Sequence, residues 1–269
     1  MKKIRFVSRA DDLGSSGSAN RAIARVVGAG FIKNVSVMAP GPRVEEAARL
    51  LAHRRDVCFG MHTTLNAEWD AVKWGPVLPL DEKSGLVDKN GYFLSDPAQF
   101  ETTKPAVETI MREVSAQLEK LHALGFDIRY IDSHMLPEMF VEGMDEAMAD
   151  FAKKKGLVDH MYFYNLPPGF RELQPSLPNV LRFFRGLPEG QYFFVTHPSL
   201  DTQEMRKTGN ARYSGADVAK GRAFETKVFS KRAVRRLLRL MGCEGVRYDE
   251  AQVRPRLTLE EVRKLFSAQ

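Results

Sequence analysis

The sequence contains little cysteine, and none of its apolar stretches is long enough to span a bilayer. Only two cysteines, Cys58 and Cys243, occur among 269 residues, and both lie in apolar surroundings. Their small number and wide separation exclude a disulfide framework and a zinc knuckle, so we expect a reducing cytoplasm as the location. The first residues also lack the apolar segment of a signal peptide, and we expect no membrane contact.

Low-complexity linkers, internal repeats and sharp shifts of composition are missing as well. Glycine and proline are spread along the chain rather than gathered into a hinge. A chain of 269 residues can bury a substantial core as one unit. We therefore expect a single domain over residues 1–269.

Positive charge is in excess, with a formal net charge of +6, but its distribution argues against a nucleic-acid partner. The excess is concentrated late in the chain, notably in residues 231–239. Val234, Leu237 and Leu238 recur there at helical spacing, which makes the arginines the solvated face of an amphipathic helix. No RNP-like aromatic motif, zinc finger or helix-turn-helix pattern accompanies them, so we expect no nucleic acid as partner.

Apolar runs alternate with helical patterns along the first part of the chain. Strands are expected at residues 4–7, 34–38 and 56–62, with helical patterns at 22–27 and 44–51 between them. Such alternation implies parallel strands joined by crossover helices. Later expected elements are helices at 107–124 and 144–155, a strand at 128–134, a helix around 180–184, strands at 190–198 and 245–248, and a capped helix at 258–266.

The segment from residue 66 to about residue 104 interrupts this alternation after the third strand. It holds both tryptophans, Trp69 and Trp74, and the aromatic pair Tyr92 and Phe93. A long insertion just past a strand end typically forms a lid or a wall of the substrate site. An ordinary covering loop whose aromatic side chains fill the core is an equally good interpretation.

Four of the expected strands end in side chains that can bind a metal ion or move a proton. Asp11 and Asp12 follow the first strand, His62 and His197 end two others, and residues 132–134 read Asp-Ser-His. In a barrel of parallel strands these ends share one mouth. One carboxylate and two imidazoles are a common ligand set for a divalent ion. A second carboxylate beside the ion can act as general base, and another histidine can protonate a leaving group.

Each of these features has a purely structural alternative. The two adjacent acids could simply start the following helix, because Asp favours N-caps and the positive end of the helix dipole. A single His62 or His197 is more often a structural residue. Four polar strand ends in one chain nevertheless favour a site, because a buried parallel strand normally ends in packing residues. The remaining histidines, His53, His122 and His160, are given no role.

The strand ends resemble those of the YdjC-like carbohydrate deacetylase family, also called the chito-oligosaccharide deacetylases. The resemblance implies an α/β fold, namely an irregular (β/α) barrel of mainly parallel strands similar to a TIM barrel. It also implies a metal-dependent hydrolase that removes the acetyl group from an N-acetylated amino sugar or chito-oligosaccharide. The similarity covers nearly the whole chain and rests on residues 8–14, 60–66, 131–134 and 196–198, with a further likeness at 222–225 and 246–248.

By matching position, the resemblance implies that Asp12, His62 and His134 bind one divalent metal ion. Zn²⁺ suits two imidazoles and a carboxylate, while the preference of Mg²⁺ for oxygen ligands is only a tendency. In the same way Asp11 is implied as general base, and His197 as an acid or a substrate-orienting residue. The expected reaction is amide hydrolysis by activated water.

The chain departs from the family's pattern at two positions. Many members carry a further histidine two residues after the Asp-Ser-His motif, where this chain has Leu136, and Arg9 stands where a residue such as asparagine is frequent. Arg222 and Glu225 match in spacing only, and we expect them to lie just behind the ligands. The resemblance is also compatible with a homodimer.

Two other function classes share part of this pattern. A carbohydrate-binding or regulatory barrel that contains a metal ion but performs no catalysis needs the histidines, yet it needs no carboxylate beside the ligand carboxylate. Asp11 therefore distinguishes it from an enzyme. A metal-dependent phosphoesterase would more naturally show further carboxylates for a second ion, and these strand ends do not carry them.

Overall fold

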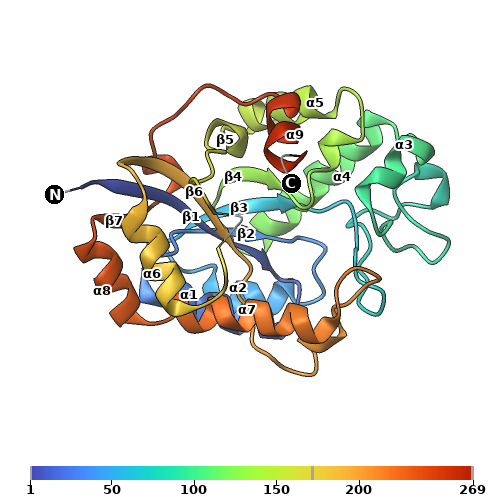
Figure 1. Ribbon diagram of the computed structural model, residues 1–269. Coiled ribbons are helices and arrows are strands. Elements are labelled where there is room, and N and C mark those ends of the chain that lie inside the picture. Colours follow the sequence, from blue (N-terminus) through green and yellow to red (C-terminus); the bar gives the residue numbers. More distant parts are fainter. Residues whose placement is uncertain (1, 171–172, 268–269) are drawn as a thin grey trace.

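The computed structural model describes residues 2–170 and 173–267 (Figure 1). Residues 1, 171–172 and 268–269 of the predicted single domain lie outside this description. The described strands are β1 (Ile4–Leu13), β2 (Asn34–Val37), β3 (Cys58–Thr63), β4 (Ile128–Ser133), β5 (Val158–Asp159), β6 (Gly190–Thr196) and β7 (Cys243–Val246).

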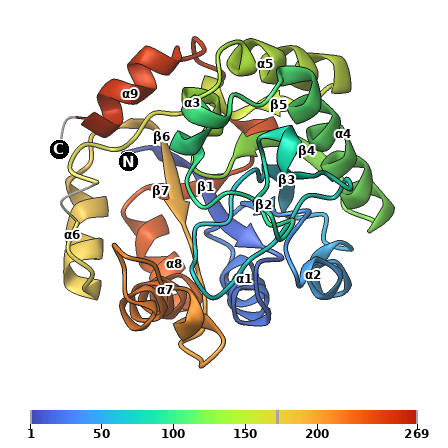
Figure 2. The ribbon, with the colours of Figure 1, turned by 90° about the vertical axis from the view of Figure 1, so that its right-hand side faces the viewer.

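All pairings between these strands are parallel, and the order in the sheet is β5-β4-β3-β2-β1-β6, with β7 also paired to β1. Helices surround the curved sheet (Figure 2). This arrangement confirms the predicted TIM-barrel-like α/β fold. The helices are α1 (Gly17–Ala29), α2 (Val44–Leu51), α3 (Phe100–Thr103), α4 (Val107–Ala123), α5 (Met144–Lys155), α6 (Leu177–Gly186), α7 (Gly215–Phe229), α8 (Arg232–Leu240) and α9 (Leu259–Ser267).

Most predicted elements are confirmed within one or two residues, and α2 and α5 begin and end where the pattern placed them. The predicted cap of α9 is present, because Thr258 Oγ1 accepts a hydrogen bond from the Glu261 amide and Glu261 Oε2 accepts one from the Thr258 amide. The long helix α7 was not predicted. Its buried residues, which include Ala219 and Thr226, do not form one apolar stripe.

β1 is the central strand, and it is longer than the predicted 4–7. It pairs with β6 from Ile4 to Ala10, with β7 along its first four residues, and with β2 from Arg9 onward. Asp11 and Asp12 therefore belong to the last residues of the strand itself. This places both acids at the carboxyl end of the sheet.

The barrel is irregular because β5 and β6 form the two edges of the sheet and do not pair within the described residues. Asn165, in the loop after β5, lies along the β6 edge: its carbonyl accepts a hydrogen bond from the Phe193 amide at 2.7 Å, and its side chain donates one to the Gln191 carbonyl at 2.7 Å. Cys58 and Cys243 are buried free thiols. Among the described helices, none has both the length and the apolar character that crossing a membrane requires.

Candidate functional site

A pocket of about 820 Å³ opens at the carboxyl ends of the strands. It receives side chains from β1, β3 and β6, and from the residues that directly follow β4. The predicted metal ligands and proton-transfer residues all line this one pocket: Asp11, Asp12, His62, His134 and His197.

A break in the regular geometry of β1 explains how two adjacent acids reach the same pocket. Successive side chains of a regular strand point to opposite faces of the sheet. In β1 the pairing with β2 shifts register between Ala10 and Leu13, and Asp12 adopts a φ of 67°. Such a bulge redirects side chains, and a non-glycine residue with positive φ is a strained conformation that often marks a functional site.

Three donor atoms converge in the floor of the pocket. Asp12 Oδ1 lies 3.6 Å from His62 Nε2 and 3.6 Å from His134 Nδ1, and the two ring nitrogens are 3.2 Å apart. Ligands held at about 2.0–2.2 Å from one ion have this spacing. Asp12 Oδ1 is buried and has no hydrogen-bond partner in the described part of the chain. An unpartnered buried carboxylate oxygen aimed at two imidazoles fits a metal ion.

Two further carboxylates orient the imidazoles. Asp132 Oδ2 lies 2.7 Å from His62 Nδ1, and Glu68 Oε2 lies 3.0 Å from His134 Nε2. Because an ionised carboxylate only accepts hydrogen bonds, each contact places the ring proton on the nitrogen that faces the carboxylate, His62 Nδ1 or His134 Nε2. The other ring nitrogen is thereby left free to bind a metal. The sequence analysis assigned no role to Asp132 or Glu68. The place of Asp132 beside the predicted ligand His134 was the only signal for it.

The charges around the three donor atoms favour a positive charge between them. Burial disfavours the charged form of His62, but Asp132 and Asp11 outweigh burial and raise the pKa of this imidazole to about 10. Burial also opposes ionisation of Asp12, yet Arg222 and His62 hold the pKa of its carboxyl well below the usual range. A proton or a metal ion can supply the charge that these groups favour.

Of the two residues expected behind the ligands, Arg222 contacts a predicted ligand and Glu225 contacts His197 instead. Arg222 Nη1 donates a hydrogen bond to Asp12 Oδ2 at 2.7 Å. Glu225 Oε2 accepts one from the backbone amide of His197 at 2.6 Å, and burial raises the pKa of Glu225 to about 7. Burial lowers the pKa of His197, which leaves its ring neutral near pH 7.

Arg9, one of the departures from the family pattern, forms ion pairs with two of the acids beside the donor atoms. Its guanidinium binds Asp11 through two hydrogen bonds of 2.6 and 2.7 Å and lies 3.1 Å from Asp132 Oδ2. It also lies over the ring of Phe193, 4.7 Å from the centroid. Arg9 thus compensates two buried carboxylates that would otherwise repel each other.

The inserted segment 66–104 contributes one wall of the pocket. Glu68 and Trp69 line the pocket, and Arg222 approaches the Trp69 ring to 5.9 Å from the centroid. Trp74 is buried and donates its indole N–H to the Asn66 carbonyl. One part of the segment therefore forms a wall of the pocket, and another part fills the core. Trp74, Tyr92 and Phe93 are not among the lining residues.

The residues after β4 form an apolar wall. Met135 and Leu136 both line the pocket and adopt φ values of 57° and 51°. Two consecutive left-handed residues without glycine are sterically costly, so the surrounding structure must hold them. Leu136 consequently presents an aliphatic side chain where many family members have a histidine.

His160 lines the pocket although no role was predicted for it. It follows β5 directly and is 4% exposed. The strand that precedes it has only two residues, which is too short to produce a recognisable pattern. His53 and His122 are exposed, in agreement with the absence of a role.

Comparison with known proteins adds family information to this geometry. Residues 5–240 match the family model described as YdjC-like protein. A carbohydrate deacetylase of Thermoanaerobacter pseudethanolicus is 29% identical over 221 residues, which are 74% of this chain and 83% of that protein. A carbohydrate deacetylase of Geobacillus stearothermophilus is 32% identical over 129 residues, or 48% of each chain.

Two solved structures share the fold. A protein of Enterococcus faecalis V583, named as a candidate cellobiose-phosphate cleavage protein, superposes with a TM-score of 0.71 at 18% identity over 92% of this chain and 98% of that one. The catalytic domain of a peptidoglycan N-acetylglucosamine deacetylase from Eubacterium rectale gives a TM-score of 0.52 at 10% identity over 96% and 94%. At these identities the likeness concerns the fold.

Proposed function

The chain belongs to the YdjC-like family, and from this membership and the geometry of its pocket we propose that it is a metal-dependent carbohydrate deacetylase. The substrate class is an N-acetylated amino sugar or chito-oligosaccharide, from which the enzyme releases acetate. Relatives named as carbohydrate deacetylases support the substrate class.

One observation carries the proposal of catalysis rather than binding. Beside the three donors Asp12, His62 and His134 lies a second carboxylate, Asp11, which is not part of this donor set and faces the same pocket. A metal-containing binding protein has no use for it. A hydrolase needs such a group to take a proton from water.

The mechanism assigns a separate task to each group. Asp12, His62 and His134 would hold a divalent ion, which when bound polarises the acetyl carbonyl and lowers the pKa of water. Asp11 receives one hydrogen bond from Arg9 on each oxygen, so each oxygen keeps a lone pair with which to accept a proton from the attacking water. A bond forms between the water oxygen and the carbonyl carbon, and the C–N bond breaks. The proton that Asp11 has accepted passes to the departing amine, and His197, whose ring is neutral near pH 7, orients the substrate through its ring N–H.

Acetate release tests this proposal. The purified protein is incubated with a panel of N-acetylated sugars after chelation and after addition of Zn²⁺ or Mg²⁺. We expect release that depends on added metal. Full activity after exhaustive chelation contradicts the mechanism, and binding without release on every sugar favours the non-catalytic barrel.

Three finer features are also part of the proposal. We assign one ion per chain, with Zn²⁺ favoured by the two imidazole donors and Mg²⁺ as the alternative, to be identified by anomalous scattering. Buried free thiols fit a cytoplasmic location. A homodimer is the expected assembly, which light scattering measures.

A further inference from the structure

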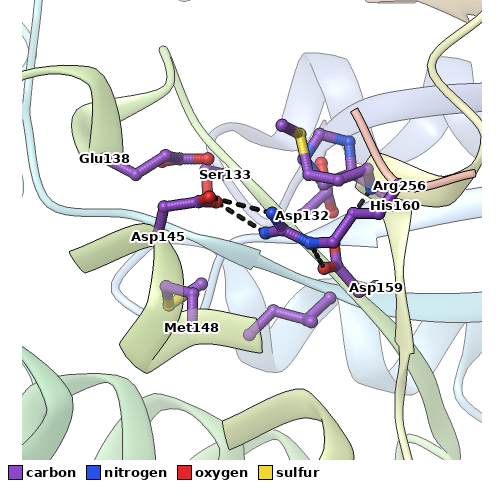
Figure 3. A pocket seen from close by; sticks show the side chains of 10 residues that line it. Asp132, Ser133, Glu138, Asp145, Met148, Asp159, His160 and Arg256 are labelled. Carbon is purple, nitrogen blue, oxygen red and sulfur yellow. Dashed lines mark hydrogen bonds and ion pairs between the residues drawn. The ribbon is translucent and has the colours of Figure 1, made fainter. Parts of the chain in front are cut away.

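A second, much smaller cavity lies behind the substrate pocket. Its volume is about 10 Å³, and it is enclosed by the end of β4, the 3₁₀ turns Pro137–Met139 and His160–Tyr162, and α5 (Figure 3). Ser133 and His160 line both this cavity and the 820 Å³ pocket. His160 therefore forms part of the partition between them.

Polar atoms without partners surround this cavity. Asp132 Oδ1, Glu138 Oε2 and both ring nitrogens of His160 are buried and make no hydrogen bond to any described residue. The three side chains are only 1%, 4% and 4% exposed. Buried polar groups are normally hydrogen-bonded, so three unpartnered groups around one cavity indicate a hydrogen-bonding occupant.

The charges around the cavity favour a neutral occupant over a cation. Arg256 lies between Asp145 and Asp159 and binds both, at 2.6 and 2.7 Å (Figure 3). The negative charge of Asp132 is already compensated by Arg9, and the same oxygen, Oδ2, is hydrogen-bonded to His62. No uncompensated negative charge therefore remains on these three aspartates to attract a cation.

Below neutral pH the two remaining groups, Glu138 and His160, are mostly uncharged. Burial raises the pKa of Glu138 to about 7 and lowers that of His160 to about 4, so His160 is uncharged near pH 7 with one donor and one acceptor nitrogen. A polar cavity needs roughly 10–15 Å³ and two to four partners to hold one water molecule. This cavity offers that size and three partners.

We propose that one buried water molecule bridges Asp132, Glu138 and His160, and that it fixes the orientation and the tautomer of the His160 ring in the partition beside the large pocket. The bridge connects the carboxylate that orients His62 to a residue that lines the large pocket. Neither the water nor the orientation of His160 depends on the proposed deacetylase function.

High-resolution crystallography tests the water directly. We expect a density peak within hydrogen-bonding distance of Asp132 Oδ1, Glu138 Oε2 and one nitrogen of His160. The peak should persist in Glu138→Gln, which retains a polar partner, and vanish in Glu138→Leu. An empty cavity in the wild-type protein overturns the proposal.

Nitrogen NMR of the histidine side chains tests the orientation of His160. We expect a single neutral tautomer in the wild type and in Glu138→Gln, and a mixture of tautomers in Glu138→Leu. If His160 keeps a single tautomer in Glu138→Leu, the proposed role of the water is wrong. This measurement needs no substrate, so it remains decisive if the protein deacetylates none of the sugars and the proposed function fails.

Discussion

At the scale of single residues, the site is organised as two acid–guanidinium pairs. Arg9 binds Asp11 and Arg222 binds Asp12, so two neighbouring carboxylates that would repel each other are compensated from different elements. Of these two neighbouring acids, Asp12 alone has a buried oxygen, Oδ1, without a hydrogen-bond partner in the described part of the chain, and this oxygen faces His62 and His134. The adjacent acids therefore differ in surroundings, and we propose that this difference makes Asp12 a metal ligand and Asp11 a general base.

Asp11→Asn and Asp12→Asn should separate these two tasks. General base catalysis is typically worth about 100- to 10,000-fold, so Asp11→Asn should lower kcat by that factor with the metal content unchanged. Asp12→Asn should lower the metal content itself. Acetate release and elemental analysis of the two purified variants measure both effects, and wild-type turnover in Asp11→Asn is the contrary result.

Asp132→Asn should weaken metal binding without removing a ligand. The carboxylate holds the Nδ1 proton of His62, and loss of such a partner typically lowers metal affinity about 10- to 100-fold. Competition with a chromogenic chelator measures the Kd. Asp127→Asn, at an exposed acid just before β4, is the matched control and should leave the Kd unchanged. Equal affinities in the two variants contradict the role of Asp132.

At the scale of elements, the inserted segment is fixed to the barrel by one buried glutamate of α4. Glu113 accepts hydrogen bonds from the amides of Val77 and Leu78 at 2.8 and 2.9 Å, and a third from Gln117. Gln117 in turn bonds both backbone groups of Thr64, just after β3. The wall that carries Glu68 and Trp69 thus depends on contacts made by a helix on the outside of the sheet.

Glu113→Ala should therefore loosen this wall. It leaves two amides without an acceptor, which should lower the free energy of unfolding by about 2–4 kcal/mol. Urea denaturation measures the loss, and hydrogen exchange should rise within residues 66–104. Glu119→Ala, at an exposed position of the same helix, should change neither. Unchanged exchange in Glu113→Ala means that other contacts hold the insertion.

At the scale of the whole molecule, the open barrel gathers ionisable groups where strands from all parts of the chain end. Glu138 should make the stability of the protein depend on pH, because burial raises its pKa to about 7 in the folded state from an ordinary 4.5. Between these values the folded protein keeps a proton that the unfolded chain has released. Stability should therefore fall as the pH rises through this window and level off above it.

Glu138→Gln should remove this part of the pH dependence. The difference in pKa corresponds to on the order of 3 kcal/mol, so the variant should gain stability relative to wild type as the pH rises from 4.5 to 8. Glu225, whose pKa is also raised to about 7, contributes equally to both proteins and cancels. Urea unfolding across this pH range tests the expectation, and parallel stability curves contradict it.

The sequence by itself determined the parallel strands, most helix ends and the polar side chains at the strand ends, because these depend on local periodicity and on which residue follows each strand. The tertiary structure alone decided how those side chains are supported. Arg222 reaches Asp12 across 210 positions, Asp132 reaches His62 across 70, and His160 turns inward after a two-residue strand. Such contacts depend on which strand ends the barrel brings together and on the bulge that turns Asp11 and Asp12 into one pocket, and local sequence patterns do not specify either.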